Sequence, residues 1–559
     1  MSSIPKDLTP GYQLSITKGT GARRWQRATY VDLLPPCNHA CPAGENIQAW
    51  LALAQAGRHQ EAWRKYMEEN PLPATHGRAC YHPCESACNR QFLDAPVAIH
   101  SLDRFLGDLA LEKGWTMPVG RPTGKRVLVI GAGPAGLSCA YHLRRLGHEV
   151  EIRDANPEPG GMMHYGIPAY RLPRKGLELE IARIQAMGVK LVSNYQVTDV
   201  LAEQGAGKFD AVFLGIGAQV ANHLEIPAMD GGKMISAISL LEQVEAGRAP
   251  ALGRVVSIVG GGNTALDAAR IAKRLGAEEA VLIYRQDRPR MKAHPQEATE
   301  AFAEGVKIKW LSTVKHFGED EVLIERMEML PDGSGCVGTG KLERLKTDSL
   351  VLAVGQHADL DFLKGVPGIR TGREGIEVDG SLQTGRSGIF AGGDMIGGPR
   401  TMTAAVGHGK KAARAIDAWL RGSTYQKQPR HPIAGFELLN LPLYLDAERR
   451  QQPAVPVAER RGFEEIYSGL SEAAARFEAG RCLSCGNCFE CDNCFAACPE
   501  QAIVKLGKGR FYRVEDSLCT GCAVSFQQCP CHAIEMVPER TVPKTGDGAK
   551  VPAAFRVRP

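Results

Sequence analysis

The stretch RVLVIGAGPAGLSCAYHLRRLGHEVEIRDA (126–155) decides the fold class of this chain. An apolar strand is followed by glycines in GxGxxG spacing, then by a helix and by a second strand that ends in an acid. Gly131 allows a tight turn, Gly133 lets the backbone approach a pyrophosphate, and Gly136 allows close packing of helix on strand. Asp154 is placed to accept hydrogen bonds from a ribose diol. The stretch therefore predicts a Rossmann-type dinucleotide site.

A second glycine turn lies further along the chain, in RVVSIVGGGNTALDAARIAKRLGAEEAVLIYRQDR (254–288). The turn has the GxGxxA spacing of the same motif and again separates an apolar strand from a helix. The second strand ends at Arg285 rather than at an acid, so a ribose diol lacks its usual carboxylate acceptor. Arg285 and Arg288 can instead pair with a 2′-phosphate, which favours NADP over NAD. The residues expected at this NAD(P) site are Gly260, Gly262, Asn263, Thr264, Ala265, Arg285 and Arg288.

A third element, SGIFAGGDMIGGPRTMTAAVGHGKKAARAI (387–416), combines a short strand, a glycine turn with Asp394, and a helix that begins near Thr403. In flavoproteins with two dinucleotide domains, a segment of this type closes the FAD site. The acid meets the ribityl chain, and the helix N-terminus faces the flavin pyrimidine. Because a helix N-terminus is positive, it stabilises an anionic reduced flavin.

The composition is that of an ordinary globular protein, with 44% hydrophobic and 23% charged residues and a net charge of +5. This weak charge does not favour nucleic acid or an anionic membrane as a partner. The N-terminus has no charged-then-apolar signal pattern, and no run approaches the roughly 18 apolar residues that cross a bilayer. The 17 cysteines are clustered, with five between Cys37 and Cys88 and ten between Cys482 and Cys531. This density indicates metal binding rather than disulfides, so we expect a cytoplasmic protein.

The C-terminal cysteines have the spacing of a bacterial two-cluster ferredoxin, in which the fourth cysteine of one run binds the other cluster. By this crossed pattern, one 4Fe-4S cluster is held by Cys488, Cys491, Cys494 and Cys529. The other set contains Cys498, Cys519 and Cys522. Its fourth ligand stays open between Ser525, Cys531 and no protein ligand, the last of which suits a three-iron cluster. Cys482 and Cys485 are further candidates. Zinc is the rival metal, but a four-cysteine run followed by proline is not typical of a zinc site.

Five further thiols lie near the N-terminus, around a stretch from Ile47 to Met67 with leucine, alanine and tryptophan at helix-like intervals. The pattern predicts a small helical domain wrapped around a metal site. Five thiols suffice for one 4Fe-4S cluster but not for two cysteine-ligated ones. We therefore expect one N-terminal cluster, and a second only if non-cysteine ligands serve. His76 stays open as a further ligand or as a solvent-facing histidine. The thiols are Cys37, Cys41, Cys80, Cys84 and Cys88.

Together these motifs resemble the small subunit of glutamate synthase and its relatives, with a ferredoxin-type domain added at the C-terminus. The match also includes EPGGMMHYGIPAYRLPR (158–174), FLGIGA (213–218), YRQDRPRMKA (284–293) and LAVGQHADL (352–360). The resemblance implies that the first fingerprint binds FAD, the inserted domain the nicotinamide cofactor, and the N-terminal domain iron–sulfur clusters. Relatives usually have two adjacent arginines where this chain has Arg285 and Gln286, which keeps NAD open. The implied FAD residues are Gly131, Gly133, Pro134, Ala135, Gly136, Asp154, Gly161, Met162, Arg171, Gly393, Asp394 and Thr403.

The expected fold is a multidomain α/β protein with two Rossmann-like domains, an N-terminal helical iron–sulfur domain and a C-terminal ferredoxin-like α+β domain. The domains expected are the helical iron–sulfur domain (1–118), the FAD-binding domain in two parts (119–248 and 366–422), the NAD(P)-binding domain (249–365), a linker (423–475), the ferredoxin-like domain (476–540) and a tail (541–559).

The expected function is flavin-dependent electron transfer between NAD(P)H and iron–sulfur clusters, because NAD(P)H delivers a two-electron hydride whereas clusters move single electrons. No residue is expected to act as nucleophile or acid–base catalyst, and no CxxC pair lies beside the flavin motif for thioredoxin-reductase-like chemistry. The chain is expected to be the electron-transfer subunit of a larger oxidoreductase, for example a 2-oxoacid:acceptor oxidoreductase. A free-standing NAD(P)H:ferredoxin oxidoreductase, with soluble ferredoxin as partner, is the alternative. A non-catalytic redox sensor or iron–sulfur scaffold is the alternative of another class.

Overall fold

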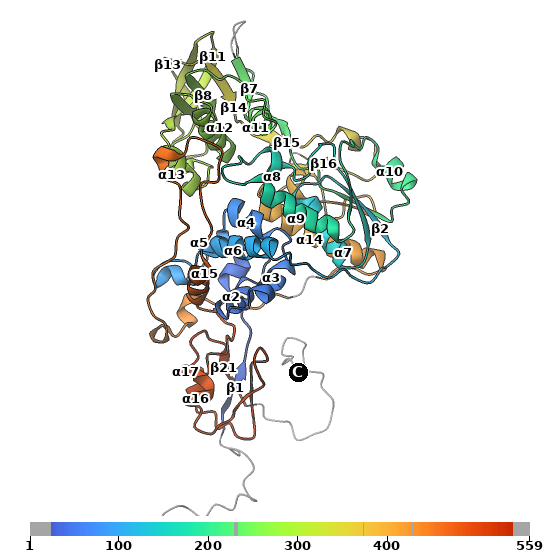
Figure 1. Cartoon of the computed structure of the whole chain (residues 1–559), viewed down its shortest axis with the longest axis vertical. Coiled ribbons are helices and arrows are strands. Elements are labelled where there is room, and N and C mark those ends of the chain that lie inside the picture. Colours follow the sequence, from blue (N-terminus) through green and yellow to red (C-terminus); the bar gives the residue numbers. More distant parts are fainter. Residues whose placement is uncertain (1–23, 228–232, 373, 427–428, 540–559) are drawn as a thin grey trace, which may run out of the picture.

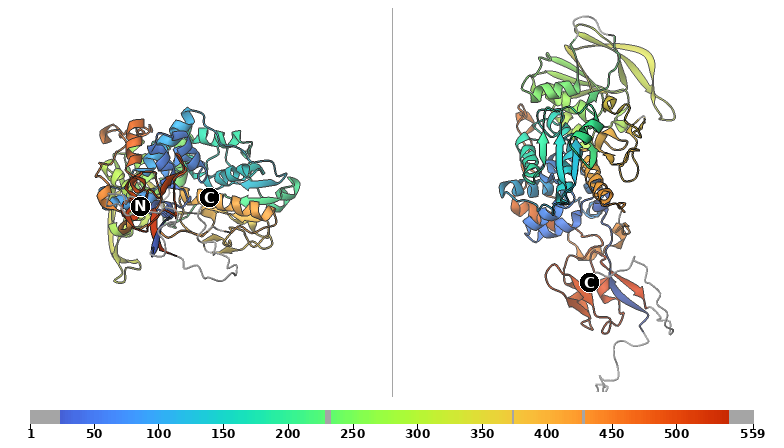
Figure 2. Two further views of the ribbon diagram at one scale, coloured as in Figure 1. Left: turned by 90° about the horizontal axis from the view of Figure 1, so that it is seen from below. Right: turned by 90° about the vertical axis from the view of Figure 1, so that its right-hand side faces the viewer.

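The computed structural model describes residues 24–227, 233–372, 374–426 and 429–539, so the expected tail lies outside it. The described part is elongated, with two nucleotide-type domains toward one end, a helical domain in the middle and a small cysteine-rich domain at the other end (Figure 1 and Figure 2). This arrangement confirms the predicted multidomain α/β class. Within the described ranges, no helix is both long and apolar enough to cross a bilayer.

The first nucleotide domain is built on a five-stranded parallel sheet in the order β18-β5-β2-β3-β4. Its strands are short apolar runs, as expected when both faces of a parallel sheet are covered. Val127, Leu128 and Val129 of β2 are fully buried. The strands are β2 (Arg126–Ile130), β3 (Glu149–Arg153), β4 (Lys190–Val192), β5 (Ala211–Leu214) and β18 (Ile389–Ala391). The helices are α7 (Pro134–Arg145), α8 (Met162–Tyr165), α9 (Arg174–Ala186), α10 (Val200–Ala206) and α14 (Met402–Leu420), of which α7 and α14 pack against each other.

The second nucleotide domain is inserted between β5 and β18 and has its own parallel sheet, in the order β10-β9-β8-β14-β7. Val256 and Ile258 of β8 share a core with the helices, while Val259 shares a second core with the antiparallel sheet β11-β12-β13. The two faces are thus covered by different structures. The strands are β7 (Lys233–Ser236), β8 (Val255–Val259), β9 (Glu279–Ile283), β10 (Lys307–Lys309), β11 (Ser312–Phe317), β12 (Glu321–Met329), β13 (Cys336–Lys346) and β14 (Ser349–Leu352). The helices are α11 (Ala237–Glu245), α12 (Asn263–Arg274) and α13 (Pro295–Ala303).

The helical domain contains the stretch from Ile47 to Met67, which forms two helices rather than one. The chain turns between them at Gly57, whose φ of +72° is a conformation that glycine adopts readily. A helix from the C-terminal part of the sequence, α15 (Glu472–Gly480), adds Ala475 and Ala479 to the same core. The other helices are α1 (Pro36–Ala40), α2 (Ile47–Gln55), α3 (His59–Met67), α4 (Pro73–Ala79), α5 (Pro83–Ser86) and α6 (Ile99–Glu112).

The cysteine-rich domain is closed by a strand from the other end of the chain. Strand β1 (Gln26–Tyr30) pairs antiparallel with β21 (Ile534–Pro538), although its residues fall in the range expected for the helical domain. The remaining elements are β19 (Ile503–Lys505), β20 (Tyr512–Val514), α16 (Asn493–Ala497) and α17 (Val524–Gln527). Segment 429–471, within the expected linker, contacts three parts of the protein: Ile433 forms a bridge with Leu34, Asn440 N donates to Pro530 O, and Ile466 N donates to Tyr170 O.

Candidate functional site: a dinucleotide cavity beside four thiol sites

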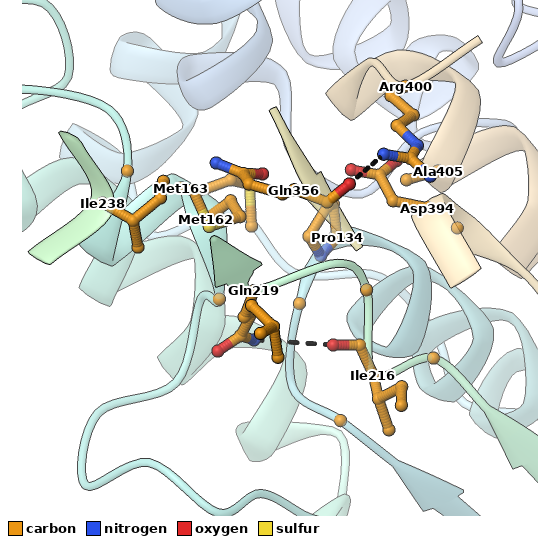
Figure 3. Close-up of a pocket in the computed structure, with 18 of the residues that line it drawn as sticks. Pro134, Met162, Met163, Ile216, Gln219, Ile238, Gln356, Asp394, Arg400 and Ala405 are labelled. Atoms are coloured by element: carbon orange, nitrogen blue, oxygen red, sulfur yellow. Dashed lines mark hydrogen bonds between the residues drawn. The ribbon is translucent and has the colours of Figure 1, made fainter. Parts of the chain in front are cut away.

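One large cavity of about 800 Å³ lies between the two nucleotide domains, and residues of both line it. In Figure 3, Pro134, Asp394 and Arg400 lie on one side of it and Ile238 of α11 on the other. All of the expected FAD residues line this cavity except Gly136 and Thr403. Of the expected NAD(P) residues, Asn263 and Thr264 line it. Two sets of residues far apart in the sequence therefore share one cavity.

The first glycine turn presents bare backbone to the cavity at the start of α7. Gly131 has a φ of +102°, and a Cβ on Gly136 would lie 1.9 Å from Gly131 O, so helix and strand approach too closely for any side chain there. A Cβ on Gly133 would instead meet nothing within 4 Å, because this residue faces the cavity. The backbone amides at this helix N-terminus are the groups that bind a pyrophosphate.

Asp154 ends β3 as predicted, and its buried carboxylate holds the glycine turn. Oδ2 accepts a hydrogen bond from Ala132 N at 2.6 Å, and Oδ1 accepts one from Asn156 N at 2.8 Å. Each carboxylate oxygen can accept a second hydrogen bond. The same group can therefore fix the loop and receive a ribose diol.

The third element closes the cavity through Asp394, whose pKa is raised by burial against the opposing effect of Arg400. Arg400 itself donates to Gln356 O at 2.6 Å (Figure 3). Thr403 does not line the cavity; its hydroxyl instead contacts Cys80 Sγ at 3.0 Å. Helix α14 thus begins between the cavity and an N-terminal thiol.

Arg171 lines the cavity, but its charge is directed to the second nucleotide domain. It pairs with Asp267 of α12 at 2.8 Å and with Glu297 of α13. Asn263, at the start of α12, accepts a hydrogen bond from His294 N at 2.8 Å. The ion pairs of Arg171 join the two domains along one wall of the cavity.

The two expected phosphate-binding arginines lie in the segment that follows β9, outside the cavity. Arg285 and Arg288 are exposed, and Tyr284 OH next to them donates to Gln286 Oε1 at 2.8 Å. Three other expected NAD(P) residues, Gly260, Gly262 and Ala265, do not line the cavity. They lie at or beneath the start of α12.

Thiol site 1 is assembled from both ends of the sequence. Its four cysteines line one small cavity between the helical domain and the segment after α15: Cys37, Cys88, Cys482 and Cys485. Burial raises the pKa of the Cys482 thiol to about 11, and Arg90 opposes this shift. Arg481, which is 2% exposed, pairs with Asp94 and Glu478 beside the site.

Thiol site 2 contains Cys41, Cys80 and Cys84, together with the carboxylate of Asp103. The five N-terminal thiols are thus divided between two groups. The sequence indicated one cluster here, and a second only with non-cysteine ligands. Burial raises the pKa of Cys84, and the neighbouring Cys80 thiol and Asp103 carboxylate add to this effect. Asp103 Oδ1 is buried without a hydrogen-bond partner among the described residues. Burial also raises the pKa of Cys80 to about 12, so a metal ion would have to displace its proton.

Sequence reasoning missed Asp103, because its place on α6 carries no spacing signal. It named His76 instead, which is 1% exposed, so the solvent-facing interpretation is wrong. His76 Nδ1 lies 3.0 Å from Leu72 O, and Nε2 has no hydrogen-bond partner in the described part of the chain. Burial lowers the pKa of this imidazole to about 4.

Thiol sites 3 and 4 lie in the cysteine-rich domain. Site 3 brings together Cys488, Cys491, Cys494 and Cys529. Burial raises the pKa of the first three, and neighbouring thiols of the set, Cys529 among them, add to this effect. Tyr30 OH of β1 lies 3.1 Å from Cys494 Sγ. Site 4 is a small cavity lined by Cys498, Cys519, Cys522 and Ser525. The two sets follow the crossed pattern of the sequence.

The fold and the cavity define a flavoprotein that uses a pyridine nucleotide and carries iron–sulfur ligands. The chain belongs to the pyridine nucleotide-disulphide oxidoreductase family, which matches residues 125–409. Residues 23–115 match the family described as dihydropyrimidine dehydrogenase domain II, 4Fe-4S cluster. The chain is therefore an FAD- and iron–sulfur-dependent NAD(P)H oxidoreductase, as predicted. In the described part of the chain, no cysteine lines the cavity, so the site offers no dithiol for disulphide exchange.

Curated relatives place the chain among electron-transfer subunits. It is 37% identical to the NADP(+)-dependent formate dehydrogenase subunit beta of Moorella thermoacetica, over 83% of this chain and 73% of the relative. It is 34% identical to the NADPH-Fe(3+) oxidoreductase subunit beta of Geobacter sulfurreducens, over 80% and 74%. It is 31% identical to the glutamate synthase [NADPH] small chain of Azospirillum brasilense, over 69% and 87%. The predicted resemblance to the glutamate synthase small subunit is confirmed.

Proposed function

We propose that this chain is the NADPH-oxidising subunit of a larger oxidoreductase complex and that its four thiol sites hold iron–sulfur clusters. The observation that carries the proposal is the contact between Thr403 of α14 and Cys80 at 3.0 Å. Helix α14 begins at the dinucleotide cavity, and Cys80 belongs to thiol site 2. The helix whose first turn lines the cavity is therefore hydrogen-bonded to thiol site 2.

The four thiol sites are linked in series by short segments of the chain. Sites 2 and 1 share the short segments that carry Cys37 with Cys41 and Cys84 with Cys88. Site 1 continues into site 3 through segment 485–488, and site 3 into site 4 through segment 494–498. Short segments between ligands keep neighbouring sites close. This serial order supports a path from the cavity to the cysteine-rich end in Figure 1.

FAD fits the cavity on the first nucleotide domain. Gly131 and Gly133 would receive the pyrophosphate, Asp154 the ribose and Asp394 the ribityl chain. When bound, the flavin supplies the conversion between two-electron hydride transfer and single-electron transfer. The chain's own residues bind and orient it, and no side chain is needed as a nucleophile. Asn263 and Thr264 enter the same cavity from α12, where they would hold the nicotinamide nucleotide against it.

The partner is proposed to be a catalytic subunit that receives electrons at the cysteine-rich end. The relatives named above are a beta subunit of a formate dehydrogenase, a beta subunit of an iron(III) oxidoreductase and a small chain of glutamate synthase, each named as one part of an assembly. A free-standing NADPH:ferredoxin oxidoreductase is the second candidate. All 17 cysteines are free thiols, which supports a reducing compartment, and we place the protein in the cytoplasm.

Anaerobic stopped-flow mixing with NADPH tests the function. We expect flavin absorbance to bleach first and the EPR signals of reduced clusters to follow. Bleaching with silent clusters would contradict an electron path through the thiol sites. Absence of bleaching would contradict NADPH oxidation altogether. Co-purification of the untagged chain with a larger polypeptide separates the subunit from the free-standing enzyme.

We propose NADPH rather than NADH as the donor, with Arg285 as the residue that recognises the 2′-phosphate. Replacing Arg285 with alanine removes one charge-assisted contact, worth about 1.5–3 kcal/mol. We expect KM for NADPH to rise by about 10- to 100-fold, while KM for NADH and both kcat values stay unchanged. Arg344→Ala, on exposed strand β13 of the same domain, is the matched control. Equal changes for the two dinucleotides would contradict the assignment.

We propose Asp103 as the fourth ligand of thiol site 2, because it offers a buried, unpartnered carboxylate oxygen beside the three thiols. Asp103→Ala is expected to lose about one iron per chain and to produce the EPR signal of a three-iron cluster. Asp103→Cys should restore the iron. Asp108→Ala, on the same helix α6 but half-exposed, is the control. If His76→Ala rather than Asp103→Ala removes the iron, the ligand is the imidazole.

A further inference from the structure

A non-cysteine side chain occupies the fourth position of thiol site 4. The site is a small cavity lined by Cys498, Cys519, Cys522 and Ser525, with Glu500 at its edge. Ser525 lies on the one-turn helix α17 and is 7% exposed. It takes the place in the sequence where the third cysteine of the second ferredoxin run belongs. A largely buried serine thus lines the same cavity as three cysteines, at the position of the missing fourth one.

The nearby Cys531 is not available to complete this site. Its Sγ lies 3.9 Å from Cys529 Sγ, which belongs to site 3, and 3.1 Å from Asn487 O. Cys531 O also accepts a hydrogen bond from Gly486 N at 2.6 Å. These contacts hold Cys531 on the side of the domain that faces thiol site 1. The sequence left Cys531 open as the fourth ligand of this site. The observed packing conflicts with that alternative.

We propose that Ser525 Oγ is an iron ligand and that thiol site 4 is a Cys3Ser cluster site. The inference rests on the proposed function, which places a cluster here. On binding, the Oγ–H bond breaks, an iron–oxygen bond forms, and the proton leaves to solvent past Cys522, which is exposed. Metal coordination makes this deprotonation possible at neutral pH, as it does for bound water and thiols.

An oxygen ligand distinguishes one iron of site 4 from the other irons of the cysteine-rich domain. Alkoxide oxygen is a harder donor than thiolate sulfur, so the iron that carries it differs electronically from its neighbours. Cluster potentials depend on ligand type, charge and exposure. Site 4, the site farthest along the series from the cavity, would therefore have a potential set apart from that of the all-cysteine site 3.

The test uses the full chain reconstituted with ⁵⁷Fe, with Mössbauer and EPR spectra recorded for wild type, Ser525→Ala and Ser525→Cys. We expect wild type to show one distinct oxygen-bound iron component. Ser525→Ala should lose about one iron per chain and produce an oxidised three-iron EPR signal. Ser525→Cys should keep the full iron content and lose the distinct component. The unchanged spectrum of site 3 reports that the domain is folded in each variant.

Three outcomes overturn the inference. Unchanged iron content and spectra in Ser525→Ala would exclude the hydroxyl as a ligand. If Glu500→Gln loses the distinct iron component, the oxygen ligand is the Glu500 carboxylate. If Cys531→Ala loses it, the component arises from the packing around site 3. Cys498→Ala distinguishes failure of this inference from failure of the proposed function. If this variant also keeps all of its iron, site 4 holds no cluster, and the proposed function of the domain fails as well.

Discussion

Replacing Cys485 with alanine is expected to remove about four irons per chain and to prevent NADPH from reducing thiol sites 3 and 4. The reason is geometric, because Cys485 shares thiol site 1 with Cys37 and Cys88, and site 1 lies between site 2 and site 3. Flavin reduction should stay at the wild-type rate, since the dinucleotide cavity contains none of these residues. Iron analysis and stopped-flow reduction with NADPH measure the two effects.

Cys336→Ala on β13 is the matched control, because that cysteine belongs to none of the four sites. It should change neither iron content nor reduction kinetics. A pair of truncations sharpens the test. A chain that ends after Gly486 keeps every ligand of site 1, whereas a chain that ends before Arg481 loses two of them. Retention of site 1 iron in the Cys485→Ala variant, or in the shorter chain, would show that the N-terminal thiols hold their cluster alone.

Gly136→Ala is expected to weaken FAD binding by about 10- to 100-fold, because the new Cβ must push α7 away from β2. The added carbon would lie 1.9 Å from Gly131 O, a backbone atom that cannot swing aside. Displacement of α7 moves the helix N-terminus that faces the pyrophosphate. Fluorescence titration of the apoprotein with FAD gives the affinity, and the melting temperature should fall even without flavin.

Gly133→Ala is the variant to compare with Gly136→Ala. Its Cβ meets nothing within 4 Å in the protein but enters the cavity, so the apoprotein should melt at the wild-type temperature while FAD binding weakens. The two glycines would then separate fold from ligand contact. If Gly136→Ala binds FAD as tightly as wild type, the turn is not the pyrophosphate site.

The parts of the fold that could be predicted from sequence are those fixed by local spacing. A GxGxxG turn needs only one strand and one helix, so Gly131 and Asp154 could be assigned from a stretch of thirty residues. The crossed ferredoxin pattern depends on short runs, and the structure likewise places Cys529 beside the run that begins at Cys488. In both cases the contacts that matter lie within one supersecondary unit.

Other parts could not be predicted, because they depend on chain segments that meet only in the folded protein. No spacing rule relates Cys88 to Cys482, so thiol site 1 was divided between two separate expectations. Asp103 has the sequence pattern of an ordinary helix position, and only its burial beside Cys80 and Cys84 makes it a candidate ligand. Thr403 matched a flavin motif, yet its hydroxyl turns to Cys80. In each case tertiary packing decides what a side chain contacts.

Thiol site 1 and the pair of strands β1 and β21 each join segments that are synthesised at different times. The hydrogen bond between Gln48 and Ser484, beside thiol site 1, joins residues 436 positions apart. At ordinary translation rates, roughly 20 to 90 s pass between synthesis of these two positions. During that time Cys37 and Cys88 have no partners and β1 has no strand to pair with. The cluster proposed for site 1 can therefore receive all four of its cysteine ligands only after Cys485 has been synthesised.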